Sequence, residues 1–149
     1  MANNRPPADA EVGVLLLLED VAAADTVIPA NYRDFLAGEP GGFLRVKRVG
    51  GGTTAKSDEP LISVQALTML DAAKPRSSHK LLAQVTSIVL ALGDEAPVIT
   101  IPADMGGAED GSDVVRFESG SVNSGPVQIP WGDEMTVLVE CIYRISTRR

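Results

Sequence analysis

An apolar stripe between residues 75 and 92 restricts the fold of this chain more than any other pattern in its sequence. Pro75 and the serines at positions 77 and 78 can begin a helix, and Gly93 follows its last apolar residue. The apolar residues recur at helical spacing, at Leu81, Leu82, Val85, Ile88, Val89 and Leu92. A helix with one apolar side buries that side against another layer. The pattern therefore predicts a helix up to about Leu92 that lies on a β-sheet.

Alternating segments predict the strands of that sheet. Residues 43–49 and 61–68 are close in the chain, so we expect a hairpin, with the Gly50–Thr54 stretch and Asp58-Glu59-Pro60 in its connection. Residues 98–101 are a short apolar run, and residues 114–119 and 135–147 are further strands. In the last of these, alternation puts one set of side chains on one face: Val137, Val139, Cys141, Tyr143 and Ile145. The other face then receives Leu138, Glu140, Ile142 and Arg144.

The N-terminal part of the chain predicts an arm, a helix and a long connection. Residues 1–8 are polar and contain Pro6-Pro7, which is typical of a flexible arm. Asp9 can cap a helix that reaches about Ala24, and a connection follows in which residues 32–36 add a turn of helix. Residues 103–113 form an acidic, glycine-rich loop, and turns are expected at 123–125 and 130–133. Residues 9–149 are thus expected to form a single α+β domain, a mainly antiparallel or mixed sheet with two helices packed on one face.

Composition excludes several classes of protein. Of the 149 residues, 20 are acidic and 13 are basic, a net charge of −7, which disfavours nucleic-acid binding over the whole surface. A single cysteine, Cys141, and a single histidine, His79, exclude an internal disulfide and any metal site built from several such residues. The longest apolar run, residues 14–18, is too short to span a membrane, and no secretory signal precedes it. We expect a protein that is made and kept in a cytoplasm, or in a particle assembled there, with no membrane partner.

Three motifs approach known sites of chemistry, and none predicts one. The sequence of residues 50–57 is similar to the motif of a phosphate-binding loop. However, Ala55 replaces the second glycine, and a strand follows where the motif needs a helix. His79 beside two serines on one helix cannot form a catalytic triad. The carboxylates of residues 104–113 do not match the spacing of a calcium-binding helix–loop–helix. We therefore predict no enzyme activity, no catalytic residue, no cofactor and no metal.

One basic cluster remains, formed by Arg45, Lys47 and Arg48 in the first strand of the hairpin. Alternation puts Arg48 on the face of Leu44 and Val46, and Arg45 and Lys47 on the opposite face. These side chains are either contacts to an acidic partner or phosphate, or a solvated strand face whose charges discourage edge-to-edge pairing.

The order of these parts resembles one family. The features are an acidic helix around residues 12–21, Phe43-Leu-Arg-Val-Lys-Arg-Val-Gly-Gly51, and Asp58-Glu-Pro followed by Leu61-Ile-Ser-Val64. A helix containing Leu81-Leu-Ala-x-Val85, then Pro130-Trp131 and a closing strand with Tyr143, complete the order. Together they cover residues 9–147 and resemble the tail terminator proteins of long-tailed bacteriophages (siphoviruses) of actinobacteria.

This resemblance implies a structural virion protein of the tail neck, assembled in the host cytoplasm. It implies a homo-hexameric ring on the head-proximal end of the tail tube, which stops tube polymerisation and joins the head–tail connector protein. DNA passes through the lumen without specific binding. Candidate contacts between subunits or rings are then the basic cluster, the hairpin tip and the acidic loop, namely Arg45, Lys47, Arg48, Gly51, Thr53, Lys56, Asp58, Glu109, Asp110 and Asp113.

Three alternatives stay open at this point. One is another ring protein of the neck, a head–tail connector or stopper. The others are a small α+β ligand-binding domain or enzyme, and a monomeric regulatory module. A ring protein uses its charged patches for assembly, whereas the other two classes do not.

Overall fold

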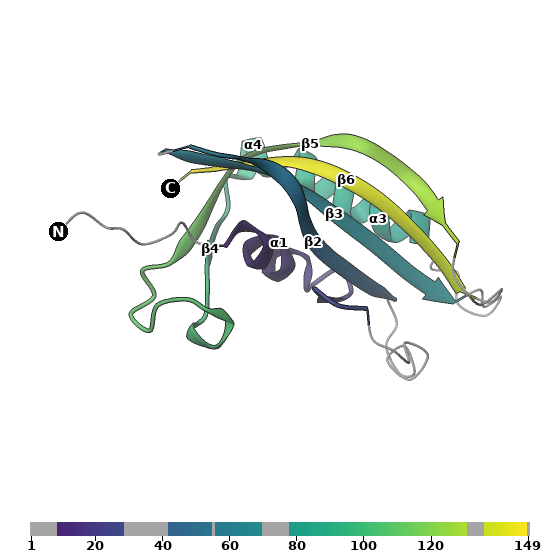
Figure 1. The fold of residues 1–149 in the computed structure, drawn as a ribbon, viewed down its shortest axis with the longest axis horizontal. Coiled ribbons are helices and arrows are strands. Elements are labelled where there is room, and N and C mark those ends of the chain that lie inside the picture. The colour runs from purple at the N-terminus through teal and green to yellow at the C-terminus, as the bar shows by residue number, and fades with distance from the viewer. Residues whose placement is uncertain (1–8, 29–41, 55, 70–77, 131–135, 149) are drawn as a thin grey trace.

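The computed structural model describes residues 9–28, 42–54, 56–69, 78–130 and 136–148 (Figure 1). Its helices are α1 (Ala10–Leu18), α3 (Ser78–Leu90) and α4 (Leu92–Glu95), with one 3₁₀ turn, η1 (Ala103–Met105). Its strands are β1 (Ala23–Asp25), β2 (Phe43–Thr53), β3 (Ser57–Met69), β4 (Val98–Thr100), β5 (Val114–Ile129) and β6 (Thr136–Arg148). The predicted α+β class is confirmed.

The strands form one six-stranded sheet in the order β1-β2-β3-β6-β5-β4. Only β1 and β2 are parallel, and the other neighbours are antiparallel, so the sheet is mixed. The predicted hairpin of β2 and β3 is confirmed, and β6 lies between β3 and β5 although it is last in the order of elements. The sheet arches over α1, with α3 along the same side (Figure 1).

The larger part of the core lies between the sheet and these helices, on the face that we call the inner face, and a smaller cluster of Phe43, Leu67 and Leu138 lies on the opposite face. The apolar stripe of α3 packs there as predicted, with Leu81, Leu82, Val85 and Val89 almost fully buried and Ile88 partly buried. The inner face of the sheet supplies, among others, Leu44, Val46, Ile62, Val64, Val139, Cys141, Tyr143 and Ile145. The alternation predicted for β2, β3 and β6 is therefore confirmed.

Polar side chains fix α3 at two points along the core. At its start, the hydroxyl of Ser78 donates to the carbonyl of Val137 (2.7 Å) and bonds the hydroxyl of Thr68 (2.7 Å). Further along, the phenol of Tyr143 bonds the hydroxyl of Thr86 (2.8 Å). Because these groups are buried, each bond also removes the cost of an unsatisfied polar atom.

The first helix is shorter than predicted. Asp9 caps it, accepting from the backbone N–H of Glu11 at 2.9 Å, but the helix ends at Leu18 and not near Ala24. Its last turn carries no basic residue, and Glu19 and Asp20 follow it, so no favourable charge meets the negative end of the helix dipole. The backbone of 23–25 pairs instead with the edge of β2. The second helix also differs: a separate short helix, α4, continues past Gly93.

The strands of the hairpin are longer than predicted. The glycines at 50–52 do not end β2, which continues to Thr53, and Asp58-Glu59-Pro60 lie inside β3. A register shift between Arg48 and Gly50 absorbs one residue, as in a β-bulge. Gly51 has φ of +98°, and a Cβ there would collide with the backbone of Glu59, so this position requires glycine.

The predicted turn at 123–125 is also wrong. Residues 114–129 form one strand, and two register shifts around Ser124 replace the turn. The expected helical turn at 32–36, the arm at 1–8 and most of the turn at 130–133 lie outside the described residues.

Candidate interaction surface

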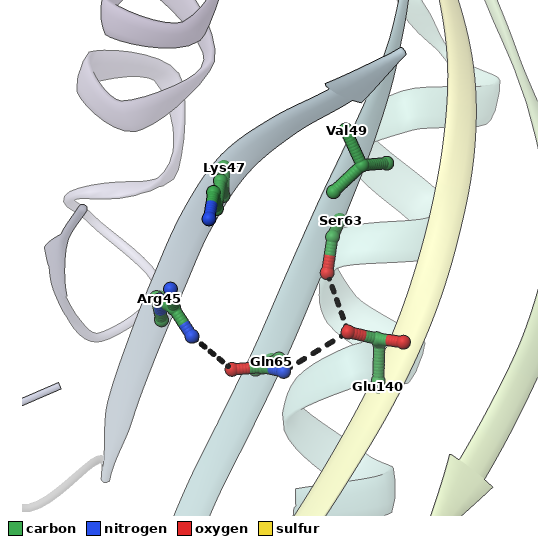
Figure 2. Close-up of a pocket in the computed structure, with 6 residues that line it drawn as sticks. All are labelled: Arg45, Lys47, Val49, Ser63, Gln65 and Glu140. Carbon is green, nitrogen blue, oxygen red and sulfur yellow. Dashed lines mark hydrogen bonds between the residues drawn. The ribbon is translucent and has the colours of Figure 1, made fainter. Parts of the chain in front are cut away.

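The opposite face of the sheet, which we call the outer face, is polar at its centre. In register, Arg45 of β2 lies beside Gln65 of β3, which lies beside Glu140 of β6. The next row along β2 and β3 places Lys47 beside Ser63. These side chains and Val49 line a shallow cavity of about 190 Å³, with α3 behind the sheet (Figure 2). We call this cavity the outer hollow.

A chain of hydrogen bonds crosses the outer hollow. The guanidinium of Arg45 donates to the carbonyl of Thr26 (3.3 Å) and to the amide oxygen of Gln65 (3.2 Å). The amide of Gln65 and the hydroxyl of Ser63 both donate to one carboxylate oxygen of Glu140, at 2.9 and 2.8 Å (Figure 2). Side chains held by several bonds are fixed in position, so the hollow is preorganised.

Lys47 stands apart from that chain. Its side chain is exposed, and it has no hydrogen bond or ion pair with any residue in the described part of the protein. The hollow therefore contains two cations and one carboxylate that already accepts two hydrogen bonds, and one of the cations, the ammonium of Lys47, uses none of its donors within the described structure.

The predicted basic cluster is divided between the two faces. Arg48 points to the inner side and forms a two-pronged ion pair with Asp58, at 2.7 and 2.8 Å. Thr53 also donates to Asp58 at 2.8 Å, and Asp58 is 4% exposed. The hydrogen bond to Asp58 raises the pKa of the Arg48 guanidinium. Arg48, Thr53 and Asp58 thus stabilise the hairpin internally, which leaves Arg45 and Lys47 as the outward pair.

The acidic loop is divided in a similar way. The carboxylate of Asp113 accepts from the backbone N–H of Ala108 (2.9 Å), and that of Asp110 accepts from the N–H of Ser112 (3.0 Å). These two acids hold the turn. Asp104 and Glu109 are exposed and make no hydrogen bond or ion pair with the described residues. The loop that joins β4 and β5 projects on the side of α1, away from the arch of the sheet (Figure 1).

The remaining candidate contacts lie at the hairpin tip. Cys141 and His79, the residues with reactive side chains, lie elsewhere. Gly51 and Lys56 are exposed at the tip. Cys141 is buried on the inner face, and burial raises the pKa of its thiol, which disfavours the reactive thiolate. His79 is exposed on the first turn of α3. Within the described ranges, no three His, Cys, Asp or Glu side chains gather as a metal site would require.

Sequence reasoning missed the three other polar members of the outer hollow, Ser63, Gln65 and Glu140. Alternation alone places Glu140 on the face opposite Tyr143, so its face could be predicted. Its neighbours could not, because β3 and β6 are 75 residues apart in the chain at the bond between Gln65 and Glu140.

No protein-family model matches the chain, and a search of curated proteins finds no match. Of the helices that the structure describes, none is long and apolar enough to cross a membrane.

Proposed function

We propose that this protein is a structural, non-catalytic subunit of a bacteriophage tail, a tail terminator that forms a ring on the head-proximal end of the tail tube. In this role it ends tube polymerisation and provides the surface for the head–tail connector protein. The ring has six copies, and DNA passes through it without specific binding. The order of sequence features that resembles siphovirus tail terminators underlies this proposal.

The observation that carries the proposal is the asymmetry of charge over the fold. The outer face bears Arg45, Lys47 and Arg144, although the chain as a whole has a net charge of −7. Glu59 on the same face is also exposed, but further exposed acids lie after α1, on α4 and in the β4–β5 loop: Glu19, Asp20, Asp94, Glu95, Asp104 and Glu109. Unlike surfaces on one subunit favour head-to-tail contacts, which form a ring when the rotation closes.

A ligand-binding domain is less well supported by the same site. The polar groups of the outer hollow, apart from Lys47, bond to one another and to the backbone, so few remain to orient a small molecule. A ligand pocket needs convergent polar groups within an enclosed, mostly apolar cavity.

Two measurements test the proposal. Native mass spectrometry should show a closed species of six copies of the 15.7-kDa chain, about 94 kDa in all. Added to polymerising tail-tube protein, the chain should shorten the tubes and sit at one end of each in electron micrographs.

The outcomes separate the alternatives. A ring that binds a connector protein but does not stop tube growth would identify a connector or stopper of the neck. A chain that stays monomeric in the presence of tube ends would refute the ring and return the question to ligand binding or regulation.

A further inference from the structure

The outer hollow offers positive charge and N–H donors, which suit the binding of a carboxylate. Lys47 supplies an ammonium with no partner among the described residues, and Arg45 uses only part of its guanidinium for Thr26 and Gln65. Glu140 in the same hollow already accepts from Ser63 and Gln65. A side chain that enters beside Lys47 therefore meets a positive charge and unused N–H donors, which favours a carboxylate.

The β4–β5 loop of the same protein carries matching groups. Asp104 and Glu109 are exposed and without partners in the described structure, whereas Asp110 and Asp113 accept backbone hydrogen bonds within the loop. The loop thus offers two free carboxylates on a backbone whose shape is already set.

The two surfaces cannot meet within one chain. The hollow opens on the outer face, across β2, β3 and β6, and the loop projects on the side of α1 (Figures 1 and 2). They can meet only between two copies, and the pair then keeps a free loop on one copy and a free hollow on the other for further neighbours.

We propose that the outer hollow receives the β4–β5 loop of a second copy of this chain, with Lys47 and Arg45 against Glu109 and Asp104. The contact deepens the proposed function, since it names the partner for the outward cations. It does not depend on the tail tube, and it excludes Arg48, Asp58, Asp110 and Asp113 from the subunit interface because they are engaged within the chain.

Charge reversal on each side tests this contact. Lys47→Glu and Glu109→Lys should each weaken self-association about tenfold, because each replaces an attraction with a repulsion between like charges. The double variant Lys47→Glu/Glu109→Lys should recover most of the wild-type affinity, since the pair is restored with reversed sign. Sedimentation velocity over a range of concentrations measures these changes, and added salt should weaken the wild-type contact.

Matched controls carry the same changes at other exposed sites. Lys56→Glu at the hairpin tip and Glu95→Lys on α4 lie outside this contact and should weaken self-association of the isolated chain much less than the Lys47 and Glu109 reversals. Far-ultraviolet circular dichroism shows whether each variant keeps its fold. All the substituted side chains are exposed, so we expect them to fold.

The results separate this contact from the proposed function. Single variants that associate like their controls, a double variant that is not rescued, or a wild-type chain that stays monomeric at every concentration would each overturn the contact. Rescue by the double variant supports it even where the chain fails to cap tail tubes, which would contradict only the terminator role. Capping by a protein insensitive to the Lys47 and Glu109 reversals would leave that role standing and refute the contact.

Discussion

The two faces of the sheet are built by the same strands, yet they differ in almost every physical respect. On β3, Ile62, Val64 and Ala66 are fully buried under helices, while Gln65 on the other side is part of a hydrogen-bonded polar row. On β6, Tyr143 is fully buried, while Glu140 on the outer face remains partly exposed. The inner face therefore supplies most of the apolar burial, whereas the outer face combines a small buried cluster, Phe43, Leu67 and Leu138, with a row of polar and charged side chains.

The largest difference in stability between the two faces should come from alanine substitutions of two neighbouring aliphatic residues on β3. Ile62→Ala leaves a cavity in the inner core and should lower the free energy of unfolding by about 3 kcal/mol. Leu61→Ala, on the outer face of the same strand, should cost about 1 kcal/mol because Leu61 is only partly buried. Urea unfolding of both variants measures the difference, and equal losses would contradict the assignment of the two faces.

A smaller effect is expected when the charge of Asp58, a native acid on the inner side, is removed. Asp58→Asn removes the ion pair with Arg48 and weakens the bond from Thr53, which should cost about 2 kcal/mol. Glu59→Gln makes the same chemical change at the next residue, which is exposed on the outer side, and should change stability by less than about 0.5 kcal/mol. Thermal and urea unfolding of the pair would show whether burial decides the cost, and matching values would argue against it.

The smallest expected effect concerns pH, and it belongs to the inner face alone. Burial raises the pKa of both Cys141 and Tyr143 above their ordinary values of 9.0 and 10.0. Above pH 9 the unfolded chain loses these protons before the folded chain does, so the unfolded state binds fewer protons and stability falls as the pH rises. Between pH 8 and pH 10 the free energy of unfolding should therefore fall as the pH rises.

Two variants sharpen the pH prediction. Cys141→Ala should flatten the decline between pH 8 and pH 10, and Tyr143→Phe should flatten it at higher pH, although both start from a lower stability. Urea unfolding at each pH measures the slope. A decline of the same steepness in both variants would assign it to other groups.

Much of this architecture could be predicted from periodicity, and the failures have physical causes. The apolar periodicity of α3 and the alternation of β6 are strong patterns because one side of each element is buried. The buried side of each could therefore be predicted. The stretch 119–128 of β5 has little apolar alternation, and backbone pairing with β6 keeps it extended where its glycines and asparagine predict a turn. Ala23 and Ala24 favour a helix by propensity, but the edge of β2 offers them a strand partner.

The candidate site was predictable only in part for a related reason. Alternation correctly separated Arg48 from Arg45 and Lys47. It could not show that Asp58 pairs with Arg48, because the sequence predicts Asp58 in a loop and the structure places it in β3. The row from Arg45 to Glu140 depends on strand order, which local patterns do not contain.

The position of β6 also determines when during synthesis the protein can fold. Helix α1, the β2–β3 hairpin and helix α3 all leave the ribosome before β6, and β5 leaves without the strand that joins it to β3. Until β6 arrives, the facing edges of β3 and β5 lack their partner and expose unpaired backbone groups. Gln65 also lacks Glu140 beside it, so the outer hollow does not yet exist. A nascent or truncated chain without β6 therefore cannot present this surface to another copy, and only chains that have completed this strand can enter an assembly built on it.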